Sequence, residues 1–278
     1  MSKTSRQFNL SYSIKFDHKK TDQIKFWLAK PVIDKYQRKI VLKSSNYPIK
    51  RYSDNYDNKI LYFHLKNENK FLFDLGIELS KDKGRVLQNW SLPNDSKLKK
   101  YTKSELFLEQ TTEVKKLTKQ IVQDKKTLHD KVRVIFDFVI DNFHYQYPVK
   151  NRGVKNLNLK NLRGDCGEYS ALMVTMLRIL GVPAKNQTGF VVYPKQKKVL
   201  EHAWLSAYFK AVGWVDFDPQ YAAIEKNKTK YFGKRSDYRV VFTSGYNVPL
   251  RPVGGSSQIL QPIACKVNTK FSDKFTIK

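Results

Sequence analysis

Cysteine, long apolar runs and acidic residues are all scarce in this chain of 278 residues. Two cysteines are too few for a disulfide framework or a cysteine-rich zinc module. No apolar run reaches the roughly 18 residues that a membrane helix needs, so the sequence predicts no transmembrane segment. The start, MSKTSRQFNLSYSI, has no hydrophobic core of a signal peptide. As written, the sequence therefore predicts a cytoplasmic protein, or an exported one if a leader precedes it.

The shortage of acidic residues leaves a large positive charge, since 52 basic residues face 25 acidic ones and the net charge is +27. Such a charge suits nucleic acid, anionic lipid or an acidic wall polymer. The basic residues are mostly lysines scattered along the chain, whereas a reader of phosphates or bases would use clustered arginines. We therefore interpret the charge as a solvated surface and predict no specific nucleic-acid partner.

The N-terminal third alternates apolar and polar residues, which is the period of half-buried strands. Several such strands predict a β-sandwich domain over residues 1–92, and the polar stretch 91–100 is expected to be a linker. The apolar residues that carry this pattern are Phe8, Leu10, Tyr12, Ile14, Phe16, Ile24, Phe26, Leu28, Leu61, Phe63, Leu65 and Leu72.

Helical periodicity follows. One helix is expected to begin near Thr127 and to end before Tyr147, because Val132, Ile135, Phe136, Val139 and Phe143 share one face. A second is expected over residues 169–180, with strands at 190–193, 202–209 and 214–217. Residues 93–250 are therefore expected to form an α+β domain, and residues 251–278 a loop-rich extension with one more strand.

The segment Gly164-Asp165-Cys166-Gly167 precedes the second helix. A cysteine at a helix N-terminus lies beside free backbone N–H groups and the positive end of the helix dipole. Both lower the pKa of a thiol, so Cys166 is a candidate nucleophile. Alone, this signal is weak, because most unpaired cysteines are small buried apolar residues.

Two further segments strengthen the prediction that Cys166 is a nucleophile. His202 is expected at the start of one strand, and Asp218 at the end of the next. A short connection makes these strands antiparallel neighbours, so that His202 and Asp218 meet at one edge. With Cys166 packed there, the three would form a nucleophile, a base and an orienting carboxylate.

Other residues keep simpler interpretations. Asp216 is the alternative acid, Glu168 an N-terminal acid that suits the helix dipole, and Trp204 and Trp214 core or cleft-wall aromatics. Tyr145 is a candidate oxyanion donor, but a core position is preferred.

No metal site or redox pair is expected. Cys265 is far from Cys166 in the sequence, and the remaining histidines lack metal-ligand spacing; these are His18, His64, His129 and His144.

The order Gly-x-Cys, His-Ala-Trp and Gly-Trp-x-x-x-Asp-Pro resembles the transglutaminase-like superfamily, strongly over about residues 100–250 and weakly before them. The resemblance implies a papain-like fold with a catalytic triad of Cys166, His202 and Asp218, preceded by a β-sandwich as in many bacterial members. It also implies closing strands at residues 231–233 and 239–241. Gln220 stands where many members have threonine, beside the triad.

The function implied is acyl transfer from an amide or peptide bond through a thioester. A cysteine protease or amidase is preferred over a cross-linking transglutaminase, with a protein or peptide as substrate. No cofactor is expected, because the sequence has neither a dense acidic loop for calcium nor the cysteines of zinc-binding relatives. The alternative is a non-catalytic scaffold that binds an anionic polymer through the basic surface. The oligomeric state stays open.

Overall fold

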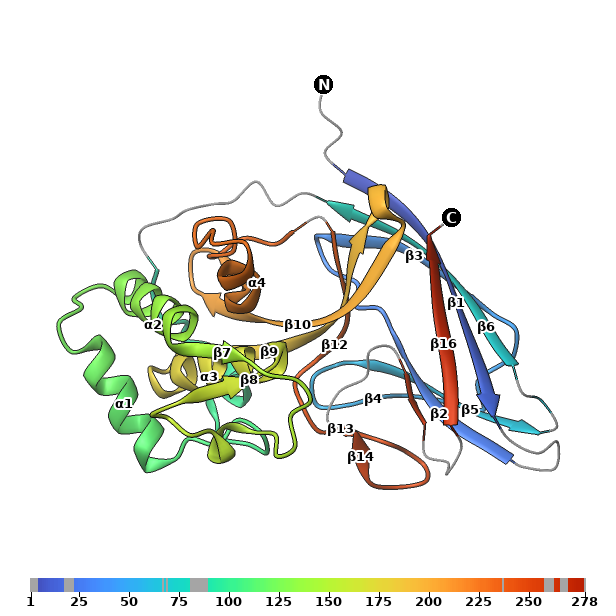
Figure 1. Cartoon of the computed structure of the whole chain (residues 1–278), viewed down its shortest axis with the longest axis horizontal. Coiled ribbons are helices and arrows are strands. Elements are labelled where there is room, and N and C mark those ends of the chain that lie inside the picture. Colours follow the sequence, from blue (N-terminus) through green and yellow to red (C-terminus); the bar gives the residue numbers. More distant parts are fainter. Residues whose placement is uncertain are drawn as a thin grey trace. The chain divides into compact units, whose positions relative to one another are not determined.

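A computed structural model describes residues 5–17, 23–66, 68, 70–80, 90–236, 238–257, 263–265 and 270–277 (Figure 1). The chain forms two compact units, and each is assembled from separate stretches of sequence. Unit 1 comprises Met1–Asp82, Thr188–His202 and Ser236–Lys278, and unit 2 comprises Lys83–Gln187 and Ala203–Arg235.

Strands and helices alternate unevenly along the chain. The strands are β1 Ser5–Asp17, β2 Gln23–Lys30, β3 Gln37–Ser44, β4 Lys50–Ser53, β5 Lys59–Lys66, β6 Lys70–Ser80, β7 Phe143–Tyr145, β8 Leu162–Gly164, β9 Ala184–Tyr193, β10 Lys198–Phe209, β11 Gly213–Phe217, β12 Arg239–Ser244, β13 Val248–Pro249, β14 Ser256–Ser257, β15 Ile263–Cys265 and β16 Lys270–Ile277. The helices are α1 Thr112–Val122, α2 Leu128–Asn142, α3 Cys166–Ile179 and α4 Pro219–Ile224, with short 3-10 turns at Ser96–Thr102, Val154–Asn156 and Pro194–Gln196.

Unit 1 contains two four-stranded sheets, ordered β16-β1-β6-β3 and β15-β2-β5-β4, which share one apolar core (Figure 1). The alternation in β1 is confirmed, because Phe8, Leu10, Tyr12, Ile14 and Phe16 are all buried. Successive side chains of a strand point to opposite faces, so burying these five fixes the register of β1. The β-sandwich prediction is thereby confirmed.

The sandwich differs from that prediction in two details. Leu72 is 40% exposed, because β6 buries Phe71, Phe73 and their odd-numbered neighbours on its other face. Strands β3 and β4 were not expected, since their sequences alternate poorly. The stretch 91–100 enters a 3-10 turn in which Leu98 is buried, and its role as a linker stays a prediction.

The C-terminal residues include the further strand that was expected there, and both β15 and β16 join sheets of the sandwich. Strand β15 pairs antiparallel with β2, and β16 pairs with β1 from Leu10↔Ile277 to Asp17↔Lys270. A strand whose partner lies more than 200 residues away leaves little local signal in the sequence, because its apolar face depends on the sheet that it joins.

Unit 2 is built around α3, whose residues are buried almost all round. Helix α2 begins after Thr127, whose hydroxyl accepts a hydrogen bond from the Asp130 amide. It ends at Asn142, so Phe143 of the expected stripe is buried but lies in β7 and not in the helix. The expected stripe of Val132, Ile135, Phe136 and Val139 is buried, and helices α1 and α4 were not expected.

A third four-stranded sheet has the order β11-β10-β9-β12. Its strands β9 and β10 begin in one unit and end in the other. Strand β12 confirms a strand at 239–241, whereas residues 231–233 form a turn and a bend, so the strand expected there is wrong. The predicted domain boundaries after residues 92 and 250 do not follow these units and stay a prediction.

Charge is shared evenly between the units. Each carries 26 basic residues, against 12 acidic residues in unit 1 and 13 in unit 2. This distribution fits the interpretation that the excess charge is spread over the protein. Among the described residues, no helix has the length and apolar character to cross a membrane.

Candidate active site

Cys166 is the first residue of α3, and Asp165 caps the helix. The Gly167 amide donates to Asp165 Oδ1 at 2.8 Å, which satisfies one of the unpaired N–H groups of the first turn. Cys166 is partly exposed. The sequence therefore placed the cysteine correctly, at a capped and accessible helix start.

The expected lowering of the thiol pKa is wrong. Burial raises the pKa of Cys166 to about 12, and the neighbouring Asp165 carboxylate adds to the rise. A hydrogen bond with the Ala203 backbone opposes it but is the weaker effect. Desolvation of the thiolate outweighs the helix dipole here, so a thiolate at neutral pH needs a base that accepts its proton.

The helix start also contacts strand β10. The Ser170 hydroxyl donates to the Cys166 carbonyl oxygen at 2.8 Å and lies 3.3 Å from the Ala203 carbonyl oxygen. These contacts fix the first turn of α3 against Ala203.

His202 directly precedes Ala203 in β10 and is 3% exposed. The strand begins at Lys198, four residues earlier than expected, so His202 lies within the strand and not at its start. His202 is the last residue of the middle stretch of unit 1, while Cys166, Ala203 and Asp218 belong to unit 2.

Asp218 follows β11 and caps α4. Its side chain accepts from the Tyr221 amide at 3.0 Å, and its own amide donates to the Tyr231 carbonyl at 3.1 Å. The expected antiparallel pairing of β10 and β11 is confirmed, with Leu205 opposite Phe217. The buried Asp218 carboxylate also contributes to the raised pKa of Cys166, which indicates that the two groups are close enough to interact.

Asp216 has other partners. Its Oδ2 accepts from Trp204 Nε1 at 3.3 Å and lies 3.7 Å from Arg235 Nε. All three side chains are buried, so Asp216 is the anion of an internal ion pair. Trp204 is a core residue, as expected, while Trp214 is half-buried beneath Lys185 Nζ, which lies 4.7 Å from the ring centroid.

An arginine that the sequence did not single out holds the acids on either side of Cys166. Arg152 Nη1 and Nη2 donate to the two oxygens of Asp165 at 3.0 and 2.5 Å, and Nη1 also donates to Glu168 Oε2 at 2.7 Å. Glu168 is 1% exposed, so it is a buried ion-pair partner and not merely a surface acid near a helix dipole. We call these three residues the arginine clamp.

The two carboxyls of the arginine clamp titrate in opposite directions. Burial raises the pKa of Asp165, but the bonds from Arg152 and Glu168 outweigh burial and hold it below its usual value. Burial and the Asp165 charge raise the pKa of Glu168 to about 7. Asp165 therefore keeps the negative charge, because it has the bidentate arginine and the Gly167 amide, and Glu168 keeps the proton longer.

Gly164 makes room for this arrangement. A Cβ at position 164 would lie 2.5 Å from Glu168 Cβ and 2.8 Å from its Cγ. The glycine before the nucleophile is therefore required by packing at Glu168.

Tyr145 is 60% exposed, so the preferred core position is wrong. Partial burial and the charge of Cys166 raise the pKa of Tyr145, which places its hydroxyl within electrostatic reach of the thiol. The role of an oxyanion donor stays open for this residue.

Among the residues that the structure describes, no group of three or more His, Cys, Asp and Glu side chains could hold a metal ion. His64 bonds Gln23, His129 contacts Asp130, and His144 is exposed. His18 lies outside the described residues.

Comparison with known proteins agrees with the α+β fold. A candidate cysteine protease from Cytophaga hutchinsonii superposes with a TM-score of 0.69 over 99% of this chain and 90% of that one, at 13% identity. The periplasmic domain of TgpA from Pseudomonas aeruginosa gives a TM-score of 0.45 over 81% of this chain and 93% of that domain, at 14% identity.

Sequence comparison identifies the domain. An uncharacterised protein of Bacillus subtilis (strain 168), YebA, is 26% identical over 126 residues, which are 38% of this chain but only 17% of YebA. The model of the transglutaminase-like superfamily matches residues 115–219, which include Cys166, His202 and Asp218. Residues 115–219 of this chain therefore form a transglutaminase-like domain.

Proposed function

We propose that this protein is a thiol-dependent acyl-transfer enzyme that hydrolyses amide or peptide bonds. Cys166 is the nucleophile, His202 the general base and acid, and Asp218 the residue that orients the imidazole. The observation that carries the proposal is the contact of the helix turn that Cys166 begins with strand β10, where Ser170 Oγ lies 3.3 Å from the carbonyl oxygen of Ala203, the residue that follows His202. The superfamily and the candidate protease of the same fold support a thiol-dependent enzyme in general.

The chemistry proceeds in two balanced steps. The Cys166 thiol gives its proton to His202, and the sulfur attacks the substrate carbonyl carbon. The imidazolium then protonates the departing amine as the C–N bond breaks, leaving a thioester on Cys166. Water attacks this thioester, His202 accepts a proton from the water, and the carboxylic acid and the free thiol are released.

The raised pKa of Cys166 agrees with this order of events. A thiol with a pKa of about 12 is protonated at neutral pH, so its proton must move to a base during the attack. We expect a ring nitrogen of His202 within about 4 Å of Cys166 Sγ in the catalytic state, and Asp218 within hydrogen-bond reach of the other nitrogen.

Hydrolysis and cross-linking differ only in the acceptor of the acyl group. A cross-linking enzyme would need to keep water from the thioester. The candidate cysteine protease of the same fold favours water as the acceptor, and with it a protease or amidase over a transglutaminase.

The same raised pKa favours a second candidate function. A thiol that stays protonated suits a non-catalytic scaffold, whose positive surface would bind an anionic polymer. In that case Cys166 would serve only to fill the space at the start of α3.

A peptide mixture incubated in water enriched in oxygen-18 distinguishes these functions. The proposal predicts new peptide termini that carry the heavy oxygen, and their absence with Cys166→Ser. Incorporation of a labelled amine without new termini would instead indicate a transglutaminase. Products of equal amount from wild type and Cys166→Ser would refute the thiol mechanism.

A further inference from the structure

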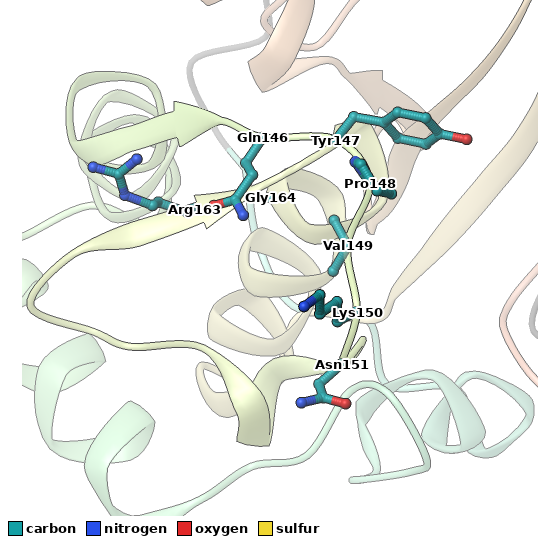
Figure 2. Close-up of a pocket in the computed structure, with 8 residues that line it drawn as sticks. All are labelled: Gln146, Tyr147, Pro148, Val149, Lys150, Asn151, Arg163 and Gly164. Carbon is teal, nitrogen blue, oxygen red and sulfur yellow. The ribbon is translucent and has the colours of Figure 1, made fainter.

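A pocket of about 370 Å³ lies beside the residues that lead into Cys166. Two stretches line it, Gln146–Asn151 and Arg163–Gly164 (Figure 2). The Gln146 amide donates to the Gly164 carbonyl at 2.8 Å and joins the two stretches. The pocket belongs entirely to unit 2.

The pocket is within reach of a substrate bound at Cys166. Gly164 lines it, and two peptide units separate Gly164 from Cys166, so their Cα atoms are at most about 7.6 Å apart. Tyr145, whose pKa responds to Cys166, directly precedes the lining residue Gln146. A peptide held at the thiol could therefore place a neighbouring group in this pocket within one or two residues.

The segment around the pocket carries positive charge without an internal counterion. Residues 147–164 include five basic residues and no acidic one. Of these five, Arg152 is already neutralised by Asp165 and Glu168. The others are Lys150, Lys155, Lys160 and Arg163, all of which are exposed.

Lys150 is the cation best placed to act in the pocket. In Figure 2 its side chain extends from the segment toward the side on which Gly164 lies, whereas Arg163 points away from Val149 and Asn151. Arg163 Nε also donates to Asn161 Oδ1 at 3.2 Å. The lining further includes the side-chain amides of Gln146 and Asn151, which can donate hydrogen bonds to an anion.

We propose that this pocket binds a carboxylate group of the substrate next to the bond that Cys166 attacks, with Lys150 as its counterion. The inference rests on the proposed function and adds a substrate class to it: peptides with an acidic side chain or a terminal carboxylate beside the reactive amide. The pocket lining contains no acidic residue, so an anionic group meets no opposing charge there.

Two alkylating reagents of similar size and different charge test the proposal. Iodoacetate carries a carboxylate and iodoacetamide is neutral, so the ratio of their rates at Cys166 measures the attraction of an anion to the site. The ratio is compared between wild type, Lys150→Glu and Lys126→Glu in the full chain, with each labelled cysteine identified by mass spectrometry. Lys126 is an exposed lysine outside the pocket, so the control matches the change in net charge.

We expect Lys150→Glu to lower the iodoacetate-to-iodoacetamide ratio about fivefold, and Lys126→Glu to leave it unchanged. The difference should shrink at 1 M salt because surface charges are then screened. An unchanged ratio in Lys150→Glu, or an equal fall in both variants, would overturn the subsite. Failure of the proposed function would look different. Both reagents would then label Cys166 slowly near neutral pH, because the thiol is not activated. The ratio of their two rates could still be measured at pH 9.

Protection of Cys166 from iodoacetamide by bound peptides distinguishes an acidic side chain from a terminal carboxylate as the group that the pocket binds. An amidated peptide with an internal glutamate should protect Cys166 if the pocket takes an acidic side chain, and a neutral peptide with a free C-terminus should protect it if the pocket takes a terminal carboxylate. Protection equal to that by a neutral amidated peptide in both cases would contradict a carboxylate subsite.

Discussion

Replacing Glu168 with glutamine would remove the proton-carrying member of the arginine clamp while preserving its shape. Glu168 is 1% exposed, and its pKa is raised from an ordinary 4.5 to about 7. Between these values the folded protein binds a proton that the unfolded chain has lost. Its stability must therefore fall as the pH rises from about 4.5 to about 7. The stabilisation that this proton provides is complete below about pH 4.5 and lost above about pH 7.

The size of this effect follows from the same pKa values. The rise of this pKa from 4.5 to about 7 corresponds to about 3 kcal/mol, most of which is lost between pH 5 and pH 8. A glutamine cannot titrate, but its amide can still donate to Asp165 as the protonated acid does. Between pH 5 and pH 8, the free energy of unfolding of Glu168→Gln should therefore fall by about 2 to 3 kcal/mol less than that of wild type.

Urea unfolding at pH 5, 6, 7 and 8 measures the effect as the difference between the two proteins. Glu113→Gln is a suitable control, because Glu113 is an exposed acid in the first turn of α1 and its hydrogen bonds lower its pKa. A lowered pKa affects stability only at acidic pH, so this control should follow wild type from pH 5 to 8. If the free energy of unfolding changed with pH equally in wild type and in Glu168→Gln, the raised pKa of Glu168 would be refuted.

Three further perturbations follow from the structure. Arg152→Met should destabilise the protein by about 3 kcal/mol in thermal unfolding, because two buried carboxyls lose their cation, and Arg152→Lys should recover part of it. Asp218→Asn should reduce peptide hydrolysis less than Cys166→Ala does, because it orients the base; equal losses would contradict that role. Gly189→Ala should prevent folding or lower the melting temperature strongly, because its Cβ would lie 1.9 Å from the Val240 carbonyl oxygen, and a wild-type melting curve would contradict this packing.

The sequence predicted features that depend on short-range periodicity. The buried face of β1 and the stripe of α2 are both set by residues two to four positions apart, and both are confirmed. Leu72 was placed on the wrong face because both faces of β6 carry apolar residues. One further strand was expected after residue 250, but the pairing of β15 with β2 and of β16 with β1 was not, because no local pattern reveals a partner at the other end of the chain.

The candidate site shows the same limit. Cys166, His202 and Asp218 were found from motifs, while Arg152 was one basic residue among many in its segment. Its partners lie 13 and 16 residues away, and only the fold brings them together. The pKa of Cys166 was misjudged because the helix dipole can be inferred from sequence, whereas desolvation depends on tertiary packing.

The central claim is that His202 activates Cys166, and iodoacetamide labelling at pH 6.5 tests it most directly. Peptide mass spectrometry would follow Cys166 and, as an internal reference, Cys265, in wild type and in His202→Ala. The account predicts that Cys166 is alkylated at least about tenfold faster in wild type than in His202→Ala, while Cys265 is alkylated at the same rate in both proteins. Equally slow labelling of Cys166 in both proteins would contradict the account and favour a non-catalytic scaffold.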